Sequence, residues 1–287
     1  MIAITGAGGK TGRALVQALA RRSAQARAVV RSMAGSALLR SLGAADVVQA
    51  EFDDVARLAS SFAGVEVVYH ICPNMHPAEL EIAARVVEAA QLAGVSRIVY
   101  HSVLHPQVEA MPHHWQKMRV EELLFTTGLD YTILQPTAYM QNLLAYMPAI
   151  CAEGVYRVPY AGHTRIGMVD LEDVVAAAAR VLTEAGHEGA IYELANGEAF
   201  TQAEVTQRLA DALDRPLRFD SVPRTDWAAN ARANGLPAYA VTTLLRMFEY
   251  YEMYGLWGNA TVLAGLLGRQ PATLNSWLLQ SRGELCR

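Results

Sequence analysis

The feature that most constrains this chain is a glycine-rich turn within its first twelve residues. Residues 1–4 have the pattern of a short buried strand, and residues 13–21 have apolar positions at helical spacing. Between these segments stand three evenly spaced glycines, Gly6, Gly9 and Gly12. A parallel strand that enters a helix through such a turn leaves free backbone amides and a positive helix end, which favour phosphate. The sequence therefore predicts a nucleotide phosphate site at its N-terminus.

The spacing of the glycines narrows the kind of nucleotide. It reads G-x-x-G-x-x-G, because the third glycine of the usual dinucleotide pattern G-x-G-x-x-G would fall on Thr11. A Walker loop needs Lys followed by Ser or Thr directly after its second glycine, whereas Lys10 and Thr11 lie between Gly9 and Gly12. Glycines also mark ordinary tight turns, but the position between a strand and a helix favours a dinucleotide. We expect Lys10 and Thr11 to contact this cofactor together with the glycines.

The composition describes a globular protein with no polyanionic partner. Of its 287 residues, 52% are hydrophobic and 18% are charged, and the formal net charge is −4. This length allows one large domain, with or without a smaller lobe. The acidic balance and the lack of a basic stripe argue against nucleic-acid binding.

The termini and the cysteines bear on location and metal content. The chain begins directly with a strand, and no apolar run reaches the ~18 residues that span a bilayer. Cys72, Cys151 and Cys286 are isolated, without a C-x-x-C pair or the spacing of metal ligands. We therefore expect a cytoplasmic protein with reduced thiols, no membrane segment and no metal.

Strands and helices alternate along the first half of the chain. The expected strands cover residues 1–4, 26–30, 46–50, 65–71, 97–103 and 131–135. This alternation predicts the α/β class, with a doubly wound parallel sheet of the Rossmann type. The pattern loosens from Gly154 onward. Residues 1–153 are thus expected to form an NAD(P)-binding domain, and residues 154–287 a smaller, mainly helical substrate or lid lobe, while the strand at 190–194 returns to the first domain.

Three strand ends carry candidate cofactor ligands. Arg31 ends the second strand, where an acid would hold a ribose 2′-hydroxyl and an Arg accommodates a 2′-phosphate, so NADP(H) is favoured over NAD(H). A solvated Arg31 that opens the next loop is the alternative. Asp53 is expected either to contact the adenine or, like Asp54, to cap the following helix. Cys72 and Pro73 follow the fourth strand, at the edge where ligands of such sheets lie.

Several segments resemble the NmrA-like proteins. They are the opening turn, the strand Ile98-Val99-Tyr100-His101-Ser102-Val103-Leu104, the run Leu129-Asp130-Tyr131-Thr132-Ile133-Leu134-Gln135-Pro136 with Tyr139-Met140-Gln141-Asn142, and Leu267-Gly268-Arg269-x-Pro271. The resemblance covers essentially the whole chain. It implies an atypical short-chain dehydrogenase/reductase that binds NAD(P). The family includes quinone reductases, dye and isoflavone-type reductases, and regulators that bind the nucleotide without turnover.

The same resemblance implies a catalytic region. Typical short-chain dehydrogenases use Tyr-x-x-x-Lys with an upstream Ser; Ser102 and Lys117 match the Ser and the Lys, but His113 stands in place of the Tyr. His113 and Lys117 lie one helical turn apart, so Lys117 is expected to bind the nicotinamide ribose. His113 or a water would then supply the proton that accompanies hydride transfer. In the alternative, His113 merely begins a helix with a solvated polar face.

The last expected strand and the late aromatic residues complete the candidate site. Pro136 and Tyr139, in the loop after this strand, are expected at the nicotinamide end, although core packing explains them equally well. Aromatic residues such as Trp227 and Phe248 would line an apolar pocket or form the core of the lobe.

These features favour an NADPH-dependent reductase of an apolar, quinone-like or aromatic small molecule. The missing Tyr favours the alternative, an NAD(P)-binding redox sensor without turnover. The expected partner is a small-molecule substrate, and a homodimer is left open.

Overall fold

The computed structural model describes residues 1–283 and 285 of the chain. The described chain divides into two compact units. The first unit contains Met1–Gln107, His114–Gln135 and Val174–Tyr192. The second contains Val108–His113, Pro136–Asp173 and the chain from Glu193 onward.

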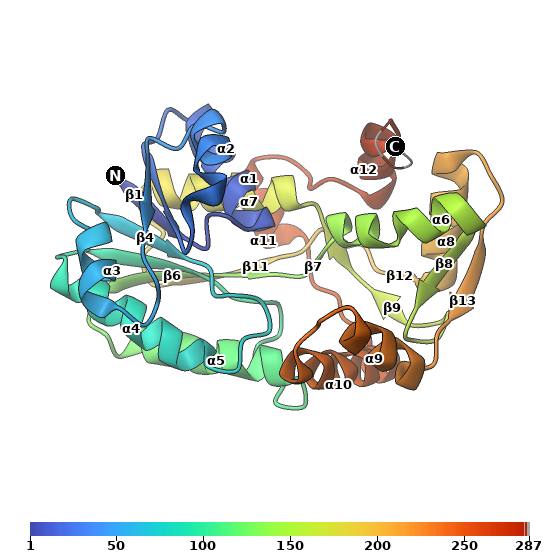
Figure 1. The fold of residues 1–287 in the computed structure, drawn as a ribbon. Helices are drawn as coiled ribbons and strands as arrows, with labels where there is room; N and C mark the ends of the chain where they lie inside the picture. Colours follow the sequence, from blue (N-terminus) through green and yellow to red (C-terminus); the bar gives the residue numbers. More distant parts are fainter. Residues whose placement is uncertain (284, 286–287) are drawn as a thin grey trace. The chain divides into compact units, whose positions relative to one another are not determined.

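A seven-stranded sheet forms the centre of the first unit (Figure 1). Its order is β11 (Ala190–Leu194), β6 (Asp130–Pro136), β5 (Arg97–His101), β4 (Val67–His70), β1 (Ile2–Thr5), β2 (Ala26–Val30) and β3 (Asp46–Gln49). Strands β1 to β6 pair in parallel. The strand order reverses at β1, which pairs with β2 on one side and β4 on the other. This arrangement confirms the predicted doubly wound sheet.

Helices cover both faces of this sheet (Figure 1). One face carries α1 (Lys10–Arg21), α2 (Ser36–Ser41) and α7 (Leu171–Thr183), and the other carries α3 (Val55–Ser61), α4 (Glu79–Leu92) and α5 (Pro112–Phe125). A short 3₁₀ helix, η1 (Met33–Gly35), follows β2. The central strands β1, β4 and β5 are wholly buried between the two helical layers, as parallel sheets require.

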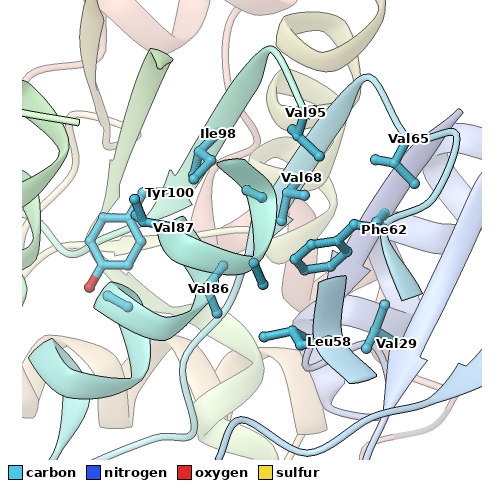
Figure 2. Close-up of a cluster of buried hydrophobic side chains, with 14 of the residues drawn as sticks. Val29, Leu58, Phe62, Val65, Val68, Val86, Val87, Val95, Ile98 and Tyr100 are labelled. Atoms are coloured by element: carbon cyan, nitrogen blue, oxygen red, sulfur yellow. The ribbon is translucent and has the colours of Figure 1, made fainter. Parts of the chain in front are cut away.

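The core on the α3, α4 and α5 face is an apolar cluster (Figure 2). Leu58 and Phe62, in and after α3, pack with Val86 of α4 and with strand residues. Tyr100 of β5 is also fully buried here. Figure 2 shows Tyr100 at the margin of the cluster, with its hydroxyl directed away from the other labelled side chains. The apolar core therefore gives way to polar groups at this end of the sheet.

The second unit combines helices with three small pairs of strands. The pairs are β7 (Ala138–Tyr139) with β10 (Met168–Val169), β8 (Val155–Val158) with β13 (Arg218–Ser221), and β9 (Arg165–Ile166) with β12 (Phe200–Thr201). Its helices are η2 (Met140–Tyr146), α6 (Met147–Glu153), α8 (Gln202–Leu213), α9 (Arg224–Ala233), α10 (Ala238–Tyr254), α11 (Thr261–Leu267) and α12 (Leu274–Ser281). The predicted mainly helical lobe is confirmed.

The late aromatic residues contribute to the packing of the second unit. Trp227 meets Phe248 edge to face at a centroid distance of 4.8 Å, and Phe248 also contacts Tyr160. Tyr254 and Trp257 are exposed. Trp227 and Phe248 therefore pack against each other, and a pocket role for the late aromatic residues stays a prediction.

Residues 1–283 and 285 bear on the expectations about membrane segments, metal ligands and thiols. No helix in this part of the chain has the length and apolar character needed to cross a bilayer. The same residues contain no cluster of three His, Cys, Asp or Glu suited to a metal ion. Cys72 is a buried free thiol, whereas Cys151 is disulfide-bonded, contrary to the expectation of reduced thiols. Cys286 lies outside the described residues.

Candidate functional site

The glycine turn between β1 and α1 has space for backbone but not for side chains. Gly6 has a φ of +65°, and a Cβ there would lie 2.8 Å from the carbonyl oxygen of Ile71. A Cβ on Gly12 would lie 2.5 Å from Cα of Ala7 and 2.6 Å from the carbonyl oxygen of Gly6. Both positions therefore require glycine. The Gly9 amide closes the turn by donating to the Gly6 carbonyl at 3.0 Å.

The start of α1 suits a phosphate group. Gly9 is the N-cap, no side chain caps the helix, and its first turn contains no acid. The amides at a helix start have no partner within the helix and carry the positive end of its dipole. Lys10 and Thr11 are the first two helical residues. The turn and the helix end thus fit the pyrophosphate of a dinucleotide.

The end of β2 lies beside this turn, and β3 is the next strand of the sheet after β2. Val30, the last residue of β2, comes within 3.9 Å of the Cβ position of Gly8, and Arg31 follows with an exposed side chain. Asp54, not Asp53, caps α3, since its carboxylate accepts from the Arg57 amide at 2.9 Å. The exposed Asp53 is free of that capping role, and its adenine contact stays a prediction.

The end of β4 is fastened to β1. Thr5 Oγ1 accepts from the Ile71 amide at 3.1 Å and lies 2.8 Å from His70 Nδ1. Cys72 follows, and burial, aided by the charge of Glu79, raises the pKa of its thiol far above the ordinary range. Cys72 is therefore a protonated thiol rather than a reactive thiolate. The predicted contact of Cys72 and Pro73 with the cofactor stays a prediction.

A buried ion pair lies at the carboxyl ends of β4 and β5. Lys117 Nζ of α5 is 2.7 Å from Glu79 Oε1 of α4, and it donates to the His101 carbonyl at 3.1 Å. The Tyr100 hydroxyl donates to the same Glu79 oxygen at 2.8 Å. The side chain of Lys117 is 8% exposed and that of Glu79 is 0% exposed. Lys117 thus lies at the carboxyl end of β5, where Glu79 and the His101 carbonyl hold it. The spacing of Lys117 to His113 in the sequence does not reveal these partners.

The histidines around this pair are neutral. Burial and, to a smaller extent, the Lys117 charge lower the pKa of His70 to about 3. The same two causes lower the pKa of His101 to about 3, and its Nδ1 lies 2.6 Å from the Tyr69 hydroxyl. Neither side chain is an imidazolium near neutral pH, so neither can act as a general acid there. The local charge is therefore concentrated on Lys117 and its carboxylate partners.

Ser102 belongs to a second buried polar group. Its hydroxyl donates to Glu121 Oε1, and the Gln135 amide donates to both oxygens of Glu121, at 3.0 and 2.9 Å. Burial raises the pKa of Glu121, while the bonds from Ser102 and Gln135 oppose that rise. The Ser102 proton therefore points toward Glu121 in this structure.

The structure brings some of the predicted residues together in the first unit. Ser102 directly follows His101, whose carbonyl binds Lys117, so both residues stand at the end of β5. His113 belongs to the second unit, as do Pro136 and Tyr139, and their roles stay predictions. Pro136 ends β6 and Tyr139 ends β7, where the sequence predicted a loop.

Four polar residues of the site escaped the sequence reasoning. They are Glu79, Tyr100, Glu121 and Gln135. Glu121 had a usable signal, because it stands four residues after Lys117 and so shares its helix face. Glu79 had none, because an acid in the first turn of a helix is ordinarily a solvated residue that favours the helix dipole.

The chain is similar to known proteins along nearly its whole length. The NmrA-like family matches residues 1–277. Quinone oxidoreductase 2 of Escherichia coli (strain K12) is 33% identical over 276 residues, which cover 96% of this chain and 96% of that protein. The (4-alkanoyl-5-oxo-2,5-dihydrofuran-3-yl)methyl phosphate reductase of Streptomyces griseus is also 33% identical, over 280 residues and 96% of each chain.

A solved structure agrees with both matches. The crystal structure of the NADPH-dependent quinone oxidoreductase QOR2 from Escherichia coli, complexed with NADPH, superposes with a TM-score of 0.86 at 32% identity. The superposition covers 98% of this chain and 99% of that chain. The family predicted from the glycine turn and the later motifs is thereby confirmed. The protein belongs to the NmrA-like family.

Proposed function

We propose that this protein is an NADPH-dependent oxidoreductase that reduces an apolar, quinone-like or aromatic small molecule. The observation that carries the proposal is the glycine turn, in which Gly6 and Gly12 leave no room for a Cβ beside an uncapped helix start. The full-length relationship to two reductases supports the direction of the chemistry. A cytoplasmic location and a homodimer stay predictions.

In this proposal the cofactor is held along the carboxyl edge of the sheet. The pyrophosphate lies on the amides of the turn, with Lys10 and Thr11, and Arg31 binds the 2′-phosphate. Asp53, Cys72 and Pro73 contribute on the adenosine side and in the loop after β4. Lys117 binds the nicotinamide ribose, and Pro136 and Tyr139 stay the predicted contacts of the nicotinamide.

The bound cofactor would supply a hydride, and the chain would supply orientation and a proton. Hydride transfer to a quinone leaves an anion that takes up one proton to become the hydroquinone. His113 or a water provides this proton in the proposal, since the buried imidazoles of His70 and His101 are neutral, with pKa values of about 3. Ser102, which donates to Glu121 in this structure, stays the predicted counterpart of the Ser in typical short-chain dehydrogenases.

Oxidation of NADPH in the presence of a panel of quinones tests the proposal. We expect the loss of NADPH absorbance to depend on both the enzyme and the quinone, with NADH a poorer donor. Tight NADPH binding without turnover on any quinone would instead support the sensor, which His113 in place of Tyr favours. Failure to bind either nucleotide in titration calorimetry would refute both functions.

Arg31→Ala tests the cofactor preference. Loss of a charged hydrogen bond to the 2′-phosphate should cost about 1.5–3 kcal/mol, or roughly ten- to a hundredfold in NADPH affinity. NADH affinity should stay the same, because NADH lacks the phosphate. Calorimetry of both nucleotides measures the difference, and Arg40→Ala, at another exposed arginine of the first unit, is the matched control. Equal weakening of NADPH and NADH would remove Arg31 from 2′-phosphate recognition.

A further inference from the structure

The buried acid beside Lys117 has no role in the function proposed so far. We propose that Glu79 is a positioning residue for Lys117, which it holds at the end of β5 with one N–H directed to the cofactor. The inference rests on the proposed function, in which Lys117 binds the nicotinamide ribose. Glu79 itself need not touch the cofactor, because it acts through the ammonium group.

The hydrogen bonds of Lys117 show how such positioning works. An ammonium group has three N–H donors. Two make short bonds, to Glu79 Oε1 at 2.7 Å and to the His101 carbonyl at 3.1 Å. The remaining contact, to the Tyr100 hydroxyl, is long at 3.5 Å. One donor is thus weakly engaged and can turn to a ligand hydroxyl while the two short bonds fix the group.

The same carboxylate is itself fixed from another element. Tyr100 donates to Glu79 Oε1 at 2.8 Å, the oxygen that also accepts from Lys117. Glu79 begins α4, Tyr100 lies on β5 and Lys117 lies on α5, so three elements meet at one oxygen. A flexible lysine side chain is thereby confined to one place, and it needs no further ordering when the ligand binds.

Glu79 also supplies the negative charge that balances the ammonium group of Lys117. A buried ammonium without a counter-charge is costly, so it must be paired or lose its proton. Glu79, fully buried beside Lys117, supplies this charge in direct contact. Glu121 also interacts electrostatically with Lys117, but its carboxylate is engaged by Ser102 and Gln135. Glu79 is therefore the partner whose loss should change both the place and the charge of Lys117.

Stability alone does not account for this arrangement. Two opposite charges buried together gain little over well-packed apolar side chains of similar size, because both must leave water. The apolar cluster on this face of the sheet includes Tyr100, so the ion pair borders apolar side chains. A buried ion pair at the ligand edge of a parallel sheet instead points to a group that must keep its charge there.

A double-mutant cycle in NADPH affinity tests the inference. The variants are Glu79→Gln, Lys117→Met and the two combined, each measured by calorimetry below its own melting temperature. We expect each single change to weaken NADPH binding about tenfold. The combined variant should bind no more weakly than Lys117→Met alone, because Glu79 has nothing left to position.

Each other outcome has a definite meaning. A combined loss near the product of the two, about a hundredfold, would show that Glu79 acts independently of Lys117 and would overturn the inference. Unchanged affinity in Glu79→Gln, with wild-type binding intact, would also overturn it while leaving the proposed function in place. Unchanged affinity in Lys117→Met would overturn it together with the role of Lys117. Absence of NADPH binding by the wild type would refute the proposed function itself.

Tyr100→Phe keeps the test valid if Glu79→Gln does not fold. This change removes the hydroxyl that holds Glu79 but leaves both charges and the ring in place. We expect a smaller loss of NADPH affinity, about two- to threefold, and no further loss when it is added to Lys117→Met. A loss that persists in the Lys117→Met background would contradict positioning through Lys117.

Discussion

Gly12→Ala is expected to abolish measurable NADPH binding and to lower the stability of the first unit. The new Cβ would lie 2.5 Å from Cα of Ala7 and 2.6 Å from the Gly6 carbonyl oxygen, and both are backbone atoms that no rotamer change can move. The turn and the start of α1 must separate, which displaces the amides that face the pyrophosphate. We expect an affinity loss of about a hundredfold or more, and a destabilisation of about 1–3 kcal/mol from overpacking.

Gly8→Ala is the matched control in the same turn. A Cβ on Gly8 would meet only Val30 Cγ1, at 3.9 Å, and Gly8 does not have a positive φ. Its melting temperature should therefore stay close to that of the wild type. Calorimetry measures the NADPH affinity of Gly12→Ala and Gly8→Ala, and thermal unfolding measures their melting temperatures. A Gly12→Ala protein that binds NADPH normally would show that the turn does not hold the pyrophosphate.

Lys117→Met is expected to cause the largest loss of stability among the site variants. It leaves the carboxylate of Glu79, which is 0% exposed, without its cation. Removing one partner of a buried ion pair typically costs about 3–5 kcal/mol. Chemical denaturation should show this loss at neutral pH.

The combined variant Lys117→Met with Glu79→Gln is the control for this prediction. With both charges removed, the remaining amide still accepts from Tyr100, so stability should return toward that of the wild type. A combined variant that is less stable than Lys117→Met would contradict the attribution to an unpaired charge. Equal stability of Lys117→Met and the wild type would do the same.

Local sequence patterns predicted the sheet well, because each strand has a local signal. The expected strand at 26–30 coincides with β2, and the turn at Gly6 leads into α1 as expected. Helix α5 shows the limit of such patterns. The sequence left open a solvated polar face for this helix, whereas its buried residues include His113, Lys117 and Glu121. Apolar spacing cannot identify a face that buries charges, because their partners come from other elements.

The candidate site was predicted in part for the same reason. The close contacts of Gly12 are with Gly6 and Ala7, its neighbours in sequence, so this part of the turn could be read from the glycine spacing, whereas the contact of Gly6 with the Ile71 carbonyl could not. The partners of Lys117 could not, because Glu79 lies 38 residues earlier and meets it only once α4 and α5 pack on one face. Ser102 was matched to the Ser of typical short-chain dehydrogenases, and its bond to Glu121 likewise depends on the packing of α5 against the end of β5.

The first unit is built from three separate stretches of the chain, and this has a consequence for its folding during synthesis. Its last segment, Val174–Tyr192, brings most of α7 and of the edge strand β11 after the chain has passed through Pro136–Asp173 of the second unit. A nascent chain on the ribosome therefore presents β6 as an open edge and leaves one face of the sheet partly bare, a state prone to pairing with other chains. The glycine turn leaves the ribosome first, but the sheet that supports it gains its edge strand β11 only when Leu194 has left the exit tunnel.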